Sequence, residues 1–137
     1  MKEKQLYYFD YNATTPIDGE VYKEMVPYLT ESYGNPSSSY FIGRQIKDRI
    51  ERIRYEISQY FNIKPEGIYF TSSGSEADNM ILKGIAIANK DKGNHIITSK
   101  IEHPAILNTC KFLEEYGFDV TYLDVNSDGI VDVEELE

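Results

Sequence analysis

The chain has 137 residues, of which 41% are hydrophobic, so it is long enough for one domain with a core and short for a two-domain enzyme. A formal net charge of -9, with no sustained run of lysine and arginine, argues against nucleic acid as a partner. No apolar stretch is long enough to span a bilayer, and the single cysteine, Cys110, excludes an internal disulfide, so we expect a cytoplasmic protein with no membrane partner.

Two amphipathic helices are predicted in the first half of the chain. The first has an N-cap at Asp18, a kink at Pro27 and an end near Gly34. Its apolar positions recur every four residues: Val21, Met25 and Leu29. The second begins near Gly43 and places four isoleucines at helical spacing: Ile46, Ile50, Ile53 and Ile57. Its other face is charged, and we interpret it as a solvated face: Lys47, Asp48, Glu51, Arg52, Arg54 and Glu56.

The second half alternates between strand and helix patterns. Strands are predicted at 68–70, 95–98 and 118–123, with helices at 76–89 and from Pro104 to Gly117 between them. This order predicts an α/β fold in which N-terminal helices precede the first strand-helix units of a mainly parallel sheet. Ligands of such sheets bind beyond the carboxyl ends of the strands.

The C-terminal residues resemble the start of another helix. Asp132 is a predicted N-cap with Glu135 as its capping-box partner, and the sequence ends two residues later. We therefore expect residues 1–62 to form an N-terminal arm with helices, and residues 63–137 to form the start of a larger α/β domain that is truncated at its C-terminus.

The segment TSSGSE at 71–76 lies where a strand leads into a helix. The unpaired amides of Gly74, Ser75 and Glu76 would point at a bound anion, so the segment is a candidate phosphate site. Alternatively, Ser75 is only the N-cap of a serine-rich turn.

His103 occupies the equivalent place in the next unit, where the loop after the strand enters its helix. Its imidazole could stack on a ring or move protons near the same sheet edge, or it could be a structural N-cap. Cys110 shares an apolar helix face with Ile106 and Leu113, which favours a buried structural thiol over a nucleophile.

Residues 124–135 match the calcium-loop pattern D-x-N-x-D-G with a terminal glutamate. The ligands would come from Asp124, Asn126, Asp128 and Glu135. Because a strand enters this loop, where a calcium loop is entered from a helix, the sequence favours a turn between the strand and a short extension over a calcium-binding module. We expect no other metal site.

Four segments in this order resemble the cysteine desulfurases, a class-V-aminotransferase-like branch of the fold-type-I pyridoxal-phosphate enzymes. They are YFDYNATTP at 8–16, GNPSS at 34–38, FTSSGSEADN at 70–79, and HIITS at 95–99 leading to Glu102 and His103. The resemblance runs from end to end and implies a partial fold-type-I architecture.

The resemblance also implies roles for individual residues. Gly74 and Ser75 would bind the phosphate of pyridoxal 5'-phosphate, and His103 would stack over its ring and assist proton transfer. Asn12 and Ala13 would lie beside the substrate, L-cysteine, whose sulfur such enzymes pass as a persulfide to an acceptor protein for iron–sulfur clusters or thiolation. The family's Schiff-base lysine and persulfide cysteine fall after the residues that match here, so we expect this chain alone to be inactive.

Other activities on the same fold stay open at this point. A selenocysteine lyase or an aminotransferase would share these motifs. The resemblance further implies a homodimer, or self-association of this chain.

Overall fold

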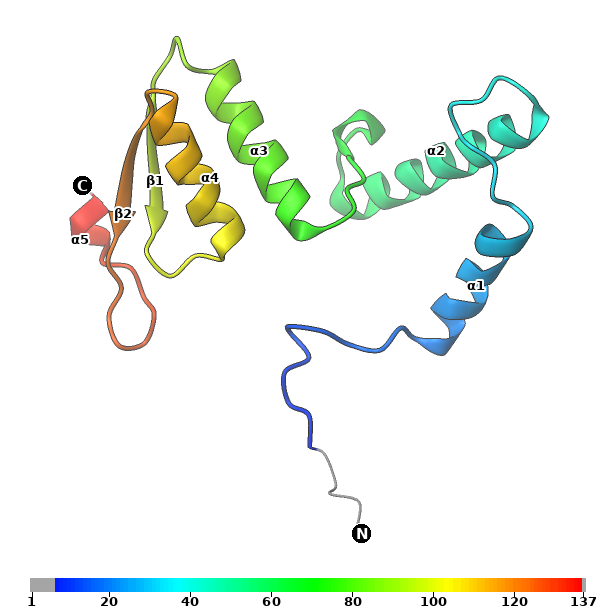
Figure 1. Ribbon diagram of the computed structural model, residues 1–137, viewed down its shortest axis with the longest axis horizontal. Helices are drawn as coiled ribbons and strands as arrows, with labels where there is room; N and C mark the ends of the chain where they lie inside the picture. The colour runs from blue at the N-terminus through cyan, green and yellow to red at the C-terminus, as the bar shows by residue number, and fades with distance from the viewer. Residues whose placement is uncertain (1–6, 137) are drawn as a thin grey trace. The chain divides into compact units, whose positions relative to one another are not determined.

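The computed structural model describes residues 7–136, in two compact units that divide between Ile68 and Tyr69. The first unit holds helices α1 (Gly19–Thr30) and α2 (Phe41–Phe61) and a 3-10 turn, η1 (Pro65–Gly67). The second holds α3 (Gly74–Ala88), β1 (His95–Ser99), α4 (Pro104–Glu115), β2 (Asp119–Leu123) and α5 (Val133–Leu136) (Figure 1). The predicted order of helices followed by strand-helix units is confirmed. No helix within residues 7–136 combines the length and apolar character that a bilayer crossing requires.

Helix α1 begins as predicted. The Asp18 carboxylate accepts hydrogen bonds from the amides of Glu20 at 2.8 Å and Val21 at 3.4 Å. Pro27 lies inside the helix, and its carbonyl accepts from the amides of Glu31 and Ser32. These two bonds close α1 at Thr30, before the predicted end near Gly34.

Helix α2 half-buries its isoleucine face, as the helical spacing predicts. The half-buried residues are Ile46, Ile50, Ile53 and Ile57. The helix ends at Asn62, which is left-handed with φ 51°, and the Ile63 amide returns to the Ser58 carbonyl at 3.1 Å. The prediction of a wholly solvated charged face is wrong at Arg54. This side chain is half-buried, pairs with Glu51 at 3.2 Å and also donates to the Ile68 carbonyl, because a guanidinium carries enough donors for both partners.

The turn that begins at Gly34 packs against the first turn of α2. Asn35 closes this turn by accepting from the amides of Ser37 and Ser38. A Cβ on Gly43 would lie 2.5 Å from the Asn35 carbonyl oxygen and 2.6 Å from that of Ser38. Gly43 is therefore needed for the close approach of the turn to α2.

We predict that Gly43→Ala destabilises the first unit by about 1–3 kcal/mol, because backbone atoms must move to admit the methyl group. Gly19→Ala is the matched control: it also lies in the first turn of a helix, and a Cβ there would meet nothing within 4 Å. Urea denaturation followed by circular dichroism measures both. Equal stability of the two variants would contradict the prediction.

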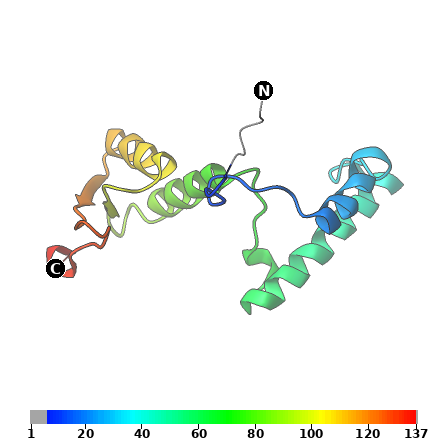
Figure 2. The same cartoon turned by 90° about the horizontal axis from the view of Figure 1, so that it is seen from below.

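The second unit is built around two parallel strands joined by α4. His95 to Ser99 pair in register with Asp119 to Leu123, and α4 runs alongside both strands (Figures 1 and 2). Four apolar side chains of this unit are buried among the described residues: Cys110, Leu113, Phe118 and Leu123. Pro104 opens α4 and Gly117, at φ 83°, follows its end, as predicted.

The strand predicted at 68–70 is absent from the described sheet. Ile68 has extended backbone angles, φ -97° and ψ 123°, but within residues 7–136 the sheet contains only β1 and β2. The bulky apolar run gives residues 68–70 the propensity of a strand, yet a strand forms only where a neighbouring strand supplies hydrogen bonds.

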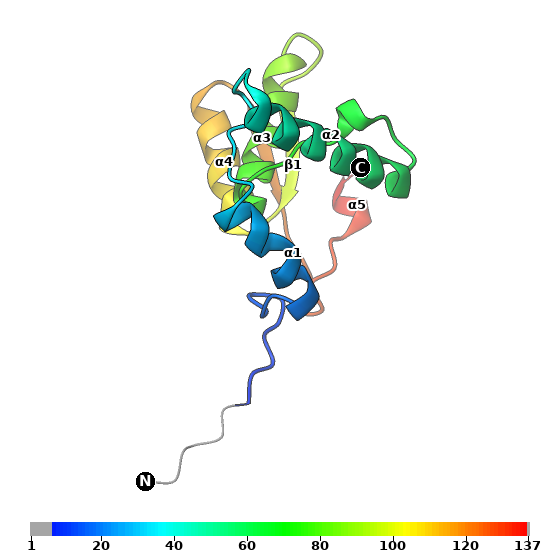
Figure 3. The same cartoon turned by 90° about the vertical axis from the view of Figure 1, so that its right-hand side faces the viewer.

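Residues 124–132 form the loop that joins β2 to α5 (Figure 3). Val125 and Val131 form an antiparallel bridge across this loop, and Gly129 at its turn has φ 77°. The predicted N-cap is confirmed, since the Asp132 carboxylate accepts from the Glu134 amide at 2.9 Å.

Candidate functional site

The first part of the site is the loop that leads into α3. Ser73 is the N-cap, because its hydroxyl oxygen accepts from the Glu76 amide at 3.2 Å. The alternative in which Ser75 is the cap is therefore wrong. The prediction that the Glu76 amide is free for an anion is also wrong, because this amide donates to Ser73. The amides of Gly74 and Ser75 have no acceptor among residues 7–136. They lie in the first turn of a 15-residue helix, where partial positive charge favours anions.

Glu76 binds back to the residue before the cap. Its carboxylate accepts from the Ser72 amide at 2.7 Å and from the Ser72 hydroxyl at 2.6 Å. Both hydrogen bonds lower the pKa of Glu76 below its ordinary value, and the bond from the Ser72 hydroxyl has the larger effect. The pKa is lowered although the Glu76 side chain is exposed. Thr71 adds a further bond, from its hydroxyl to the Ser73 carbonyl at 3.1 Å.

His103 is the N-cap of α4. Its Nδ1 accepts from the Ala105 amide at 3.1 Å, so the neutral ring carries its proton at Nε2. The structural reading of this histidine is thus confirmed, and the same cap fixes the tautomer that any further role would use. Beside it, the Glu102 carboxylate accepts from the Ser99 hydroxyl at 3.1 Å.

Ser75 and His103 line one cavity of about 460 Å³ between α3 and α4. The structure thus brings together two residues that the sequence placed at equivalent turns of successive units. The other lining residues are Asn79, Lys83, Pro104, Ala105, Asn108 and Thr109. A cationic amine, amide groups and a hydroxyl around a helix N-terminus form a donor set that suits an anionic ligand.

Sequence reasoning missed four polar residues of this cavity: Asn79, Lys83, Asn108 and Thr109. A signal was present, because Asn79 and Lys83 follow Ser75 at intervals of four residues and so share its helix face. Asn79 also donates to the Ser75 carbonyl at 2.9 Å, and the Lys83 amine lies 4.3 Å from the centre of the Phe112 ring on α4.

Asn12 and Ala13 lie in the first unit, in an exposed turn where the Ala13 amide donates to the Asp10 carbonyl at 3.1 Å. The substrate-side role of Asn12 and Ala13 stays a prediction.

Cys110 is fully buried, as its apolar helix face predicts. Burial raises the pKa of its thiol, and the negative charges of Glu114 and Glu102 raise it further. A thiol that resists ionisation is a poor nucleophile, so this cysteine has a packing role.

The residues of the calcium-loop pattern have other partners. The Lys100 amine lies 2.7 Å from both carboxylate oxygens of Asp124, and the Asn126 side chain accepts from the amides of Asp128 and Ile130. Two of the four expected calcium ligands thus have protein partners: Asp124 is paired with Lys100, and Asn126 accepts from backbone amides of the loop.

We predict that millimolar calcium produces no binding heat with this protein, because Lys100 would have to release Asp124 first. Isothermal titration calorimetry measures this directly. Heat that fits one site per chain, and that increases in a Lys100→Ala variant, would show that the loop binds calcium after all.

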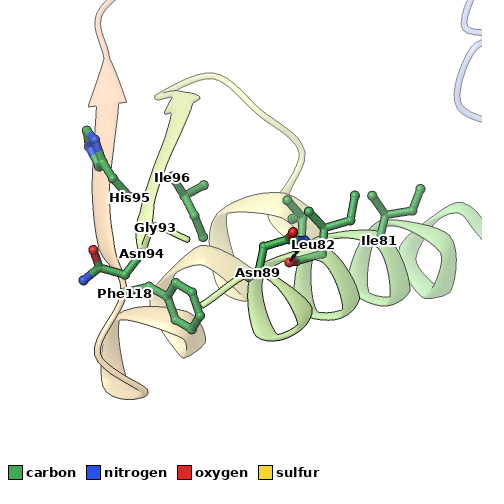
Figure 4. A pocket seen from close by; sticks show the side chains of 10 residues that line it. Ile81, Leu82, Asn89, Gly93, Asn94, His95, Ile96 and Phe118 are labelled. Carbon is green, nitrogen blue, oxygen red and sulfur yellow. Dashed lines mark hydrogen bonds between the residues drawn. The ribbon is translucent and has the colours of Figure 1, made fainter. Parts of the chain in front are cut away.

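A second cavity, of about 270 Å³, is mainly apolar. Ile81 and Leu82 line it from α3, and Asn89 lines it from the C-cap of that helix. Ile96 lines it from β1, and Phe118 immediately precedes β2 (Figure 4). His95 is the one titratable residue among its described lining residues, and its ring bonds to the Thr121 hydroxyl at 2.8 Å. The cavity therefore offers mainly apolar packing surface.

The sequence model of the class-V aminotransferases matches residues 7–137. The chain belongs to the class-V aminotransferase family.

Among curated proteins, this class-V aminotransferase chain is similar to a cysteine desulfurase IscS of Clostridium botulinum (strain Kyoto / Type A2). The two are 54% identical over 134 residues, which are 98% of this chain and 34% of the relative. A cysteine desulfurase IscS of Methanosarcina thermophila is 51% identical over the same share of this chain and 33% of its own. The chain thus spans about a third of the length of the curated relatives it matches.

Solved structures agree with this family assignment. A NifS-like protein superposes with a TM-score of 0.85 at 41% identity, over 94% of this chain and 35% of its own. A structure described as SspA in complex with cysteine superposes with a TM-score of 0.83 at 38% identity, over 94% of this chain and 37% of its own. The predicted partial fold-type-I architecture is confirmed.

The Glu76 contacts predict a titration. We expect a folded-state pKa below the ordinary glutamate value, so the contact with Ser72 is present at neutral pH and is lost as pH falls through that lowered pKa. Ser72→Ala removes the larger of the two causes and should raise the pKa of Glu76 part of the way back. Carboxyl NMR measures both values, and identical titrations in the two proteins would contradict the assignment.

Proposed function

We propose that this chain forms the part of a pyridoxal-phosphate-dependent cysteine desulfurase that holds the cofactor's phosphate and one face of its ring. The cavity that joins Ser75 to His103 is the observation that carries this proposal. The names of its relatives support the reaction, in which L-cysteine becomes L-alanine and its sulfur passes to an acceptor as an enzyme persulfide.

The residues present fit the cofactor's phosphate. The amides of Gly74 and Ser75 have no acceptor among residues 7–136, and the Ser75 hydroxyl adds a third donor. The positive charge of Lys83 in the same cavity also favours a dianion. Gly74 presents no side chain, so a phosphate can approach its backbone closely.

His103 fits the cofactor's ring. When bound, pyridoxal phosphate supplies an electron sink that makes bonds of an amino acid labile. The cap bond from the Ala105 amide to Nδ1 fixes the ring of His103 and leaves Nε2 to hold or move a proton. A planar imidazole at this position can stack on a pyridine ring while its orientation stays constant.

The proposal extends to partners. The family resemblance implies a lysine that attaches the cofactor and a cysteine that carries the persulfide, and we expect both outside the third of the relatives that this chain matches. The partners are L-cysteine, a sulfur-acceptor protein and a second copy of the enzyme, and the setting is the cytoplasm. Alone, the 137 residues should neither attach the cofactor covalently nor release sulfide.

A chimera tests the proposal. Residues 1–137 would replace the matching third of the Clostridium botulinum relative, and sulfide release from L-cysteine would be measured with the cofactor bound. We expect activity in the chimera, and a loss of about 10²–10⁴-fold in kcat with His103→Ala, the usual effect of removing a positioned acid or base.

His95→Ala is the matched control, because this second histidine lies on β1 and bonds to Thr121 at 2.8 Å, outside the cavity that holds Ser75. Sulfide release should change little in that variant. A folded chimera that binds the cofactor but releases no sulfide, or equal effects of the two histidine variants, would overturn the proposal.

A further inference from the structure

We propose that Glu76 is the positioning residue of the phosphate site: it holds Ser72 by both of its donors, so that the amides of Gly74 and Ser75 stay free for the anion. The inference deepens the proposed function and rests on it. Glu76 itself would not touch the phosphate, since its Oε2 is occupied by Ser72 at 2.7 and 2.6 Å.

The contacts around Ser73 show how this positioning works. Ser73 caps α3 by accepting from Glu76 at its hydroxyl and from Ala77 at its carbonyl, while the Thr71 hydroxyl binds that same carbonyl. Glu76 is thus joined to the loop at two successive residues: it donates one hydrogen bond to Ser73 and accepts two from Ser72. Residues 71–73 are thereby fixed to the first turn of α3, and the two amides that follow are the ones left without an acceptor.

Charge alone predicts the opposite effect. A carboxylate in the first turn of α3 repels a phosphate at the same helix end, so its neutralisation should tighten phosphate binding. Positioning predicts that the same change weakens binding, because the loop is released. The sign of the change therefore separates the two explanations.

The test uses the 137-residue protein and amide NMR. Inorganic phosphate and pyridoxine 5'-phosphate, which has no aldehyde to react with lysines, would be titrated while the Gly74 and Ser75 amides are followed. We expect Glu76→Gln to raise both dissociation constants about tenfold, the size of effect expected when a charge-assisted hydrogen bond that holds a site is lost. Unphosphorylated pyridoxine should show no such difference.

Three further variants separate position from charge. Glu76→Asp keeps the charge but shortens the reach to Ser72, so it should also weaken binding. Ser72→Ala removes one of the two donors and should give a smaller loss. Asp78→Asn removes one negative charge from the same helix, at a side chain that shares no ion pair within residues 7–136, so it should leave phosphate binding unchanged or slightly tighter.

Each outcome decides something. Unchanged or tighter phosphate binding in Glu76→Gln, with helix content preserved by circular dichroism, would overturn the role of Glu76 and leave the proposed function standing. Wild-type amides of Gly74 and Ser75 that do not respond to phosphate would overturn the phosphate site, and this role with it. If Glu76→Gln fails to fold, the ordered losses in Ser72→Ala and Glu76→Asp still decide the question.

Discussion

Parallel pairing of β1 and β2 is the constraint on which the second unit depends. Two parallel strands cannot be joined by a tight turn, so the chain must cross from the end of one to the start of the other, and α4 is that crossover. The crossover buries Cys110 and Leu113 on the helix together with Phe118 and Leu123 on the returning chain. The same geometry sets His103 at the point where α4 begins, beyond the carboxyl end of β1.

The site follows from repetition of one local motif. Both α3 and α4 start with a side chain that caps the first turn, Ser73 in one case and His103 in the other. Because the two helices pack together, these starts share one cavity, in which backbone amides, a hydroxyl, an imidazole and the Lys83 amine are available. A site of this kind needs few conserved side chains, since much of its attraction for anions comes from the helix ends.

Much of the apolar surface of the second unit is open. Ile81 and Ile85 on α3 are more than half exposed, and they line the smaller cavity beside β1. The sheet has two strands among the described residues, and the chain spans about a third of the curated class-V relatives it matches. The apolar surface is thus open among the described residues, while the polar cavity at the helix starts is formed by the packing of α3 on α4.

The sequence by itself determined most of what is local. Caps at Asp18 and Asp132, the isoleucine face of α2 and the glycine after α4 could be predicted because each depends on residues a few positions apart. The pairing of Ser75 with His103 could be anticipated from two equivalent turns in a parallel arrangement. The family resemblance implied that these residues bind pyridoxal 5'-phosphate.

Tertiary structure decided what depends on distant partners. The apolar run at 68–70 did not become a strand, because no neighbouring strand among the described residues supplies its hydrogen bonds. The Arg54 side chain is half-buried on the charged face of α2, because it donates to the Ile68 carbonyl, 14 residues further along the chain. Asp124 bonded to Lys100 across 24 positions of sequence, and Lys83 joined the cavity through its contact with Phe112. Sequence spacing fixes which residues share a helix face, but only the packing of one element on another fixes what that face meets.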